Sequence, residues 1–289
     1  MNKENYLRGM LMIILSAFFF ACMNVCVRLS GDLPFVQKSF FRNLVAAVFA
    51  AIVILKNHTS LKVQKDCRIP LAMRCIFGTM GILCNFYAVD HLMVADASIL
   101  NKLSPFFAIL FSLLFLKEKI TRFQSGCVVL AFVGCLFIVK PSFQNTALMP
   151  ALIGVCGGLG AGIAYTMVRY LGNHGLKGPV IVFYFSLFSC LIVLPWVIAG
   201  FVPVSVKQLC ILLMAGLFAA GGQFCITAAY TYAPARKISI YDYSQILFAT
   251  ILGFCLFGEI PDVYSFIGYG LIVAASLLMF LYNRKKKDI

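Results

Sequence analysis

Ten long apolar segments recur along this chain, and they constrain its fold more than any other feature of the sequence. Each contains close to the roughly 20 residues that an α-helix needs to cross a bilayer. Hydrophobic residues make up 62% of the chain and charged residues 12%, whereas a soluble domain needs about 25% charged residues. The sequence therefore predicts an all-α membrane protein with ten transmembrane helices. The segments lie near residues 9–28, 34–55, 70–90, 95–116, 123–139, 149–169, 178–199, 207–231, 236–257 and 263–282.

Lysine and arginine residues gather at alternate ends of these segments. With a cytoplasmic N-terminus, most of the 24 basic residues fall in cytoplasmic connections, to which we also assign Arg74. The external connections hold Arg28, Lys140 and Lys207. Because the cytoplasmic loops of membrane proteins are enriched in Lys and Arg, both termini are predicted to be cytoplasmic, in a multi-pass protein of the cell membrane.

The rest of the composition argues against several other classes of protein. The net charge of +14 comes from basic residues at the ends of apolar segments, so nucleic acid is not an expected partner. The twelve cysteines show no CxxC or Cys/His spacing, and we expect no metal site. The motifs HExxH, GxSxG and GxxxxGK are absent. Their absence predicts that the protein is not an enzyme, needs no cofactor and does not hydrolyse ATP.

An internal repeat divides the chain into two halves. Residues 108–120 (AILFSLLFLKEKI) and 249–261 (ATILGFCLFGEIP) each place a glutamate after an apolar run. The repeat predicts two domains of five helices, residues 1–145 and 146–289. Because five is odd, the second half is expected to enter the membrane inverted relative to the first. Inverted halves around a central site are the architecture of many secondary transporters.

Three stretches resemble the EamA branch of the drug/metabolite transporter superfamily. They are LSPFFAILFSLLFLKEKIT at 103–121, ILFATILGFCLFGEIPD at 246–262, and Phe40-Phe41-Arg42 near the start of the second segment. The resemblance covers essentially the whole chain. It implies ten helices in two inverted halves around a central cavity, with export or exchange of amino acids or other small metabolites.

Three basic residues, Lys38, Arg42 and Lys102, fall inside apolar segments. A charged side chain at the centre of a transmembrane helix costs about 2.5–3.5 kcal/mol on insertion scales, so such residues often mark a functional site. Lys38 is near the end of its segment and is expected to extend to the outer interface, whereas Arg42 and Lys102 lie deeper. The deeper pair are therefore candidates for binding substrate.

The face of the fourth segment that carries Lys102 is polar. Ser98, Asn101, Lys102 and Pro105 follow the i, i+3, i+4, i+7 spacing of one helix face. We predict that this face lines a water-accessible cavity, where the ammonium group of Lys102 pairs with a substrate carboxylate. Pro105 is expected to bend the helix and free a backbone carbonyl nearby.

Further polar residues are candidates for the same cavity, although each taken singly is also explained by an interhelical hydrogen bond worth less than about 1 kcal/mol. Asp242 is either a proton-coupling group or a structural counter-ion to Lys102 or Arg42. Gly154, Gly158 and Gly162 share one helix face, which allows another helix to approach closely. The uncharged cavity candidates are Asn85, Tyr87, Gln223, Tyr241, Tyr243 and Gln245.

We therefore expect a secondary transporter that moves a small anionic or zwitterionic solute by alternating access, driven by proton coupling or exchange. Amino acids are the leading substrates, and nucleoside-like cofactors, vitamins and drugs are the alternatives. An intramembrane enzyme and a channel are the rival classes, and neither explains inverted halves. The expected partners are the small-molecule substrate and the lipid bilayer, and a monomer is compatible with these expectations.

Overall fold

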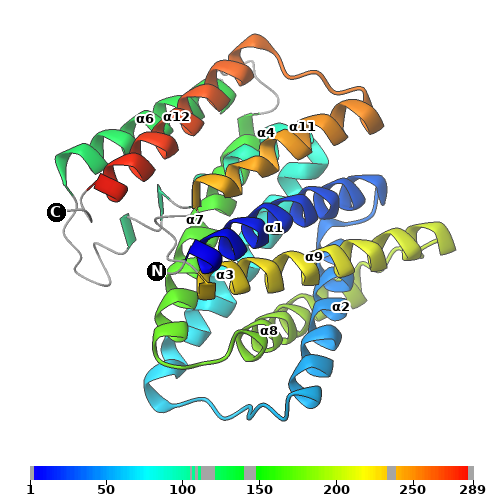
Figure 1. Cartoon of the computed structure of the whole chain (residues 1–289). Helices are drawn as coiled ribbons and strands as arrows, with labels where there is room; N and C mark the ends of the chain where they lie inside the picture. The colour runs from blue at the N-terminus through cyan, green and yellow to red at the C-terminus, as the bar shows by residue number, and fades with distance from the viewer. Residues whose placement is uncertain are drawn as a thin grey trace.

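The structure is a computed structural model that describes residues 3–104, 106–107, 110–111, 121–139, 148–232 and 239–285. Its described part is helical, which confirms the predicted all-α class (Figure 1). Seven of the helices, α1, α2, α3, α7, α8, α9 and α12, are long and apolar enough to cross a membrane. The helices are α1 (Lys3–Leu29), α2 (Phe35–Lys56), α3 (Lys65–His91), α4 (Val94–Asn101), α6 (Arg122–Val139), α7 (Leu148–Asn173), α8 (Gly178–Ala199), α9 (Val206–Tyr232), α11 (Ser244–Phe257) and α12 (Val263–Lys285), with the 3₁₀ helix η1 (Ser239–Tyr243).

Neither the fourth nor the ninth apolar segment is one continuous α-helix in its described part. Helix α4 ends at Asn101, a turn follows at Lys102, and helical backbone resumes at Ser104. Pro105, which was expected to bend this segment, and Glu118 lie outside the described residues. In the second half, η1 occupies the matching place before α11. Interrupted helices at membrane depth occur where the backbone is enclosed in protein or borders a cavity.

The packing of the helices repeats between the two halves. Counterparts are α1 and α7, α2 and α8, α3 and α9, and α6 and α12, while α4 corresponds to the stretch before α11 that includes η1. Exchanging counterparts converts the contact of α3 with α7 into that of α9 with α1, and the contact of α4 with α7 into that of η1 with α1. It converts the contacts of α2 with α8 and of α6 with α12 into themselves. The chain therefore has an approximate two-fold axis that relates its halves.

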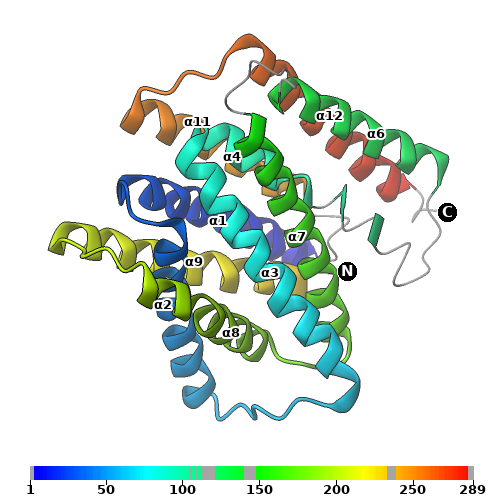
Figure 2. The same ribbon diagram turned by 180° about the vertical axis from the view of Figure 1, so that it is seen from behind.

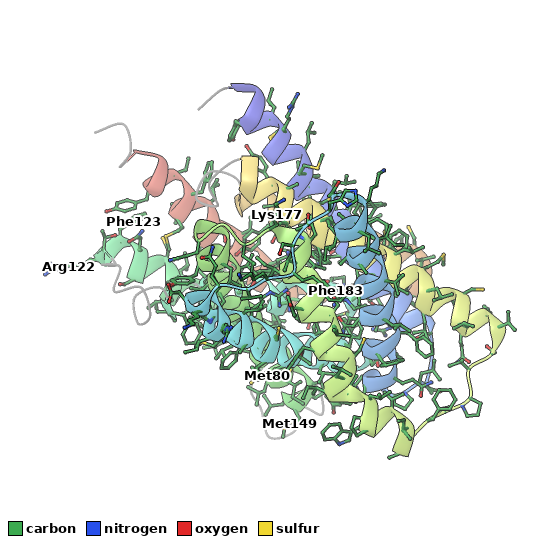
Figure 3. All side chains as sticks on the ribbon, turned by 90° about the horizontal axis from the view of Figure 1, so that it is seen from below. Met80, Arg122, Phe123, Met149, Lys177 and Phe183 are labelled. Carbon is green, nitrogen blue, oxygen red and sulfur yellow. The ribbon has the colours of Figure 1, made fainter. Side chains whose placement is uncertain are left out.

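Counterpart helices run in opposite directions, as inverted halves require. Gln37 at the start of α2 exchanges two hydrogen bonds with Val202, which follows the end of α8. Phe123 at the start of α6 stacks on Tyr282 near the end of α12, at the edge of the molecule (Figure 3). The start of α1 and the end of α12 lie at the same end of the bundle (Figures 1 and 2). This arrangement agrees with both termini on one side of the membrane.

Glycine allows two helices of the core, α3 and α7, to approach closely. A Cβ atom added to Gly160 would lie 2.8 Å from the carbonyl oxygen of Phe77, and one added to Gly81 would lie 3.1 Å from the amide nitrogen of Ala161. Of the glycines expected to permit close packing, Gly158 faces the backbone of α4, where an added Cβ would lie 2.7 Å from a carbonyl oxygen. The tightest approach of α3 to α7 thus uses a glycine outside the stripe expected from the sequence.

Candidate functional site

A cavity lies in the middle of the bundle, between the two halves of the chain. Its lining comes from α1, α2, α3 and α4 of the first half and from α7, α8, α9 and α11 of the second, together with the residue that follows α4. Cationic, amide and aromatic side chains share this lining. The cations are Arg42, Arg74 and Lys102, the amides are Asn24, Asn85, Asn101, Gln223 and Gln245, and the rings are those of Phe20, Phe86, Tyr165 and Phe185.

The structure brings many of the residues singled out in the sequence to this cavity. Ser98 is not part of the lining; its hydroxyl lies 3.3 Å from the amide nitrogen of Asn24, which donates to it. Asn85 in turn donates to the side-chain oxygen of Asn24 at 3.2 Å. These two hydrogen bonds join α3, α1 and α4, so Ser98 supports the lining from behind. The predicted residues that line the cavity are Arg42, Asn85, Asn101, Lys102, Gln223 and Gln245.

Two of the tyrosines expected in the cavity are elsewhere. Tyr87 is two residues after Asn85, and two residues turn a helix by about 200°. Its ring therefore lies on another face of α3, where it stacks on His91. The hydroxyl groups of Tyr241 and Tyr6 are 3.0 Å apart, a contact that ties η1 to α1. Tyr87 also packs edge-to-face against Phe35 of α2, so both tyrosines connect structural elements instead of lining the cavity.

Lys102 reaches the cavity already paired with a carboxylate. Its Nζ lies 2.6 Å from Oδ2 of Asp242, and both side chains are buried. The hydroxyl group of Tyr243, also expected in the lining, instead donates to the backbone carbonyl of Lys102 at 2.9 Å. These contacts connect the fourth and the ninth apolar segments. Asp242 is thus paired with Lys102, as the counter-ion role requires, and its proton-coupling role stays a prediction.

Two arginines share one aromatic ring at the cavity wall. The Cζ atom of Arg74 lies 3.8 Å from the centre of the Phe185 ring, and the Cζ atom of Arg42 lies 5.9 Å from it. Arg42 is 2% exposed and Arg74 is 3% exposed. Arg42 also donates to the side-chain oxygen of Asn43 at 2.5 Å. Guanidinium groups stacked on an aromatic face keep their edges free for planar anions.

Arg74 was assigned to a cytoplasmic connection, and that assignment is wrong. Helix α3 begins at Lys65, so Arg74 lies in the third turn of a transmembrane helix and its side chain is buried. Its position within the apolar segment 70–90 was the signal in the sequence. Phe185 carried no comparable signal, because a phenylalanine in an apolar segment is indistinguishable from a packing residue.

Two ion pairs lie at the end of the bundle that the charge distribution predicts to be external. Arg28 pairs with Glu259 at 2.8 Å and donates to the carbonyl of Leu92. Lys38 pairs with Asp90 at 2.6 Å. The expectation that Lys38 extends to the outer interface is wrong, because its side chain is 1% exposed and is neutralised inside the protein.

A second hollow continues from the cavity toward the opposite end. It shares Arg74, Tyr165 and Gln223 with the first, and it extends to Gly178 and Thr227. Gly178 opens α8 directly after Lys177, which is labelled in Figure 3. Among the described residues, two ion pairs thus lie at one end of the bundle, and a second hollow adjoins the cavity toward the other end.

The chain also resembles known proteins along nearly its whole length. The model of the EamA-like transporter family matches the chain twice, over residues 7–140 and 148–281. The chain belongs to the EamA-like transporter family. The two matches begin at residues 7 and 148, and the same separation of 141 residues relates Lys102 to Tyr243, which contact each other. The family membership expected from the sequence is confirmed, and the protein is a multi-pass membrane transporter and not an enzyme.

Curated relatives span almost the whole length of the chain. The pseudopaline exporter CntI of Pseudomonas aeruginosa is 32% identical over 283 residues, which cover 96% of this chain and 97% of that protein. The riboflavin transporter of Brucella anthropi is 26% identical over 272 residues, covering 90% of this chain and 94% of that one. A solved crystal structure matches with a TM-score of 0.69 at 14% identity, over 96% of this chain and 98% of the other. This last likeness concerns the fold alone.

Proposed function

We propose that this EamA-like transporter exports or exchanges a small organic metabolite by alternating access around the central cavity. The observation that carries the proposal is the lining of that cavity, which both halves of the chain supply. When a site lies between two inverted halves, rocking one half against the other exposes it to one side of the membrane and then to the other. The ion pairs at the predicted external end and the hollow toward the opposite end agree with a conformation closed to the outside.

The proposed substrates are amino acids and other small solutes that carry a carboxylate. Three cations line the cavity, and buried cations in a membrane protein mark the paths of ions and substrates. The similarity to a pseudopaline exporter supports outward transport of a small organic molecule. A vitamin is the alternative substrate, because the cavity is also lined by aromatic rings and a relative is a riboflavin transporter.

The proposed energy source is an ion gradient or exchange, since the sequence contains no GxxxxGK motif. Purified protein in lipid vesicles is expected to show saturable counterflow of a radiolabelled carboxylate-bearing metabolite or of riboflavin. The flux should respond to a pH gradient or to unlabelled substrate on the opposite side. Vesicles without protein are the control. Flux that requires ATP hydrolysed by this chain, or that never saturates, would contradict secondary transport.

A further inference from the structure

We propose that Arg42 and Arg74 together form a binding site for a dianion, so that the transported solute carries two carboxylates. The inference rests on the proposed transport function and makes its substrate class more specific. It also moves the expected anion contact from Lys102 to a pair of arginines that come from α2 and α3.

The carboxylates described near the cavity do not neutralise Arg42 or Arg74. The described carboxylates near the cavity already have cationic or hydroxyl partners: Asp242 pairs with Lys102, and Asp96 accepts a hydrogen bond of 2.6 Å from the hydroxyl of Tyr269. At the predicted external end, Asp90 is paired with Lys38 and Glu259 with Arg28. Among the residues that the structure describes, neither cavity arginine has a carboxylate within ion-pair distance. Their Nε atoms are buried and have no described hydrogen-bond partner.

The cavity lining carries two positive charges that the other described residues do not neutralise. Because Asp242 neutralises Lys102, the described lining keeps two uncompensated positive charges, one on each arginine. Uncompensated charge at membrane depth is costly. A solute with one carboxylate neutralises one of these charges, whereas a dicarboxylate neutralises both. The planar guanidinium fork also matches the geometry of a carboxylate, with which it forms two parallel hydrogen bonds.

Gly78 makes room for the guanidinium group of Arg74 at the cavity wall. A Cβ atom added to Gly78, one turn along α3, would lie 2.0 Å from a guanidinium nitrogen of Arg74 and 2.8 Å from the ring of Phe185. The guanidinium group therefore occupies the space that a side chain at position 78 would fill. Glycine at this position leaves room for the guanidinium group of Arg74, whose Cζ atom lies 3.8 Å from the centre of the ring that Arg42 also approaches. This packing of Arg74 against the cavity wall is an observation independent of the number of uncompensated charges.

The apolar part of the lining fits the remainder of such a solute. Phe20, Met23, Ile82 and Phe86 border the same cavity as the arginines. A hydrocarbon chain or ring between two carboxylates would contact these side chains, and its burial contributes about 25 cal/mol per Å² of apolar surface. The lining therefore suits an organic dicarboxylate better than a small inorganic anion.

The test measures binding by the shift in thermal unfolding of the purified full-length chain in detergent. The probes are dicarboxylates from succinate to suberate, monocarboxylates of matched chain length, L-leucine, L-lysine and inorganic phosphate, all at equal ionic strength. At least one dicarboxylate is expected to bind tenfold or more tightly than its matched monocarboxylate. Equal binding of the two, or preference for phosphate or a cation, would overturn the proposal.

Variants test the arginines themselves. Arg42→Gln and Arg74→Gln are each expected to weaken dicarboxylate binding at least tenfold, which corresponds to about 1.4 kcal/mol. Gly78→Ala keeps both charges but displaces the guanidinium group of Arg74, and it should weaken binding as well. Arg68→Gln is the matched control, because Arg68 is an exposed arginine on the same helix. Variants that bind dicarboxylates like the unaltered protein would overturn the site.

The dicarboxylate preference can still be tested if the glutamine variant of Arg74 does not fold. If Arg74→Gln does not accumulate, Arg74→Lys keeps the charge and removes the planar fork, and it should lose the preference for dicarboxylates. An unchanged preference in Arg74→Lys would contradict the proposal. Vesicle transport separates the two proposals: saturable flux of neutral or cationic solutes alone leaves the transport function standing and overturns the dianion site. Absence of flux for every solute, with dicarboxylate binding intact, overturns the transport function instead.

Discussion

Replacing Lys102 by methionine is expected to destabilise the folded protein by about 3–5 kcal/mol, the usual cost of removing one partner of a buried ion pair. The Asp242 carboxylate would lose its partner at 2.6 Å and stay buried, since only 8% of that side chain is exposed. Its other oxygen, Oδ1, already has no described hydrogen-bond partner. Thermal unfolding in detergent and the monodisperse fraction after purification measure the effect. This outcome replaces the expectation from sequence that Lys102 pairs mainly with substrate.

Two matched variants separate the ion pair from general damage. The double variant Lys102→Met/Asp242→Asn removes both charges and should recover most of the lost stability, because no buried carboxylate is left unpaired. Lys38→Met should cost less than Lys102→Met, because its partner Asp90 is 17% exposed and reaches solvent. If Lys102→Met is as stable as the unaltered protein, the ion pair does not support the fold. If the double variant is no better than Lys102→Met, lost packing explains the defect.

Gly160→Ala is expected to destabilise the protein by about 1–3 kcal/mol, the range for overpacking a filled interior. The added Cβ would lie 2.8 Å from the carbonyl oxygen of Phe77 and 3.1 Å from the amide nitrogen of Gly81. Backbone atoms cannot rotate away as a side chain does, so α3 and α7 must separate. That separation also moves Arg74 and Tyr165 apart across the cavity. The midpoint of thermal unfolding in detergent measures the loss.

Gly172→Ala is the control on the same helix. An added Cβ there meets no atom within 4 Å, and alanine favours a helix over glycine by about 0.5–1 kcal/mol. The control variant is therefore expected to be as stable as the unaltered protein or slightly more stable. If Gly160→Ala behaves in the same way as this control, close packing of α3 on α7 does not limit stability.

The class of fold followed from local features of the sequence. A helix needs a fixed length of apolar residues to cross a bilayer, so the number and type of the segments could be read along the chain. The repeat and its odd number of helices led to inverted halves for the same reason. Charged residues at membrane depth, such as Arg42 and Lys102, were also visible, because each contradicts its apolar neighbours. Both residues do line the cavity.

The pairing of those charges was decided by the tertiary structure. Lys102 meets Asp242 across 140 residues of sequence, and Lys38 meets Asp90 across 52. Arg42 and Arg74 are brought together by the ring of Phe185, which belongs to the other half of the chain. Helical periodicity determines which residues share a face, but not the rotation and depth at which two helices meet. Those depend on packing between helices, such as the approach of α3 to α7 at Gly160. The sequence alone therefore indicated that Arg42 and Lys102 need partners but missed Arg74, and only the packed helices decided which of these charges have one.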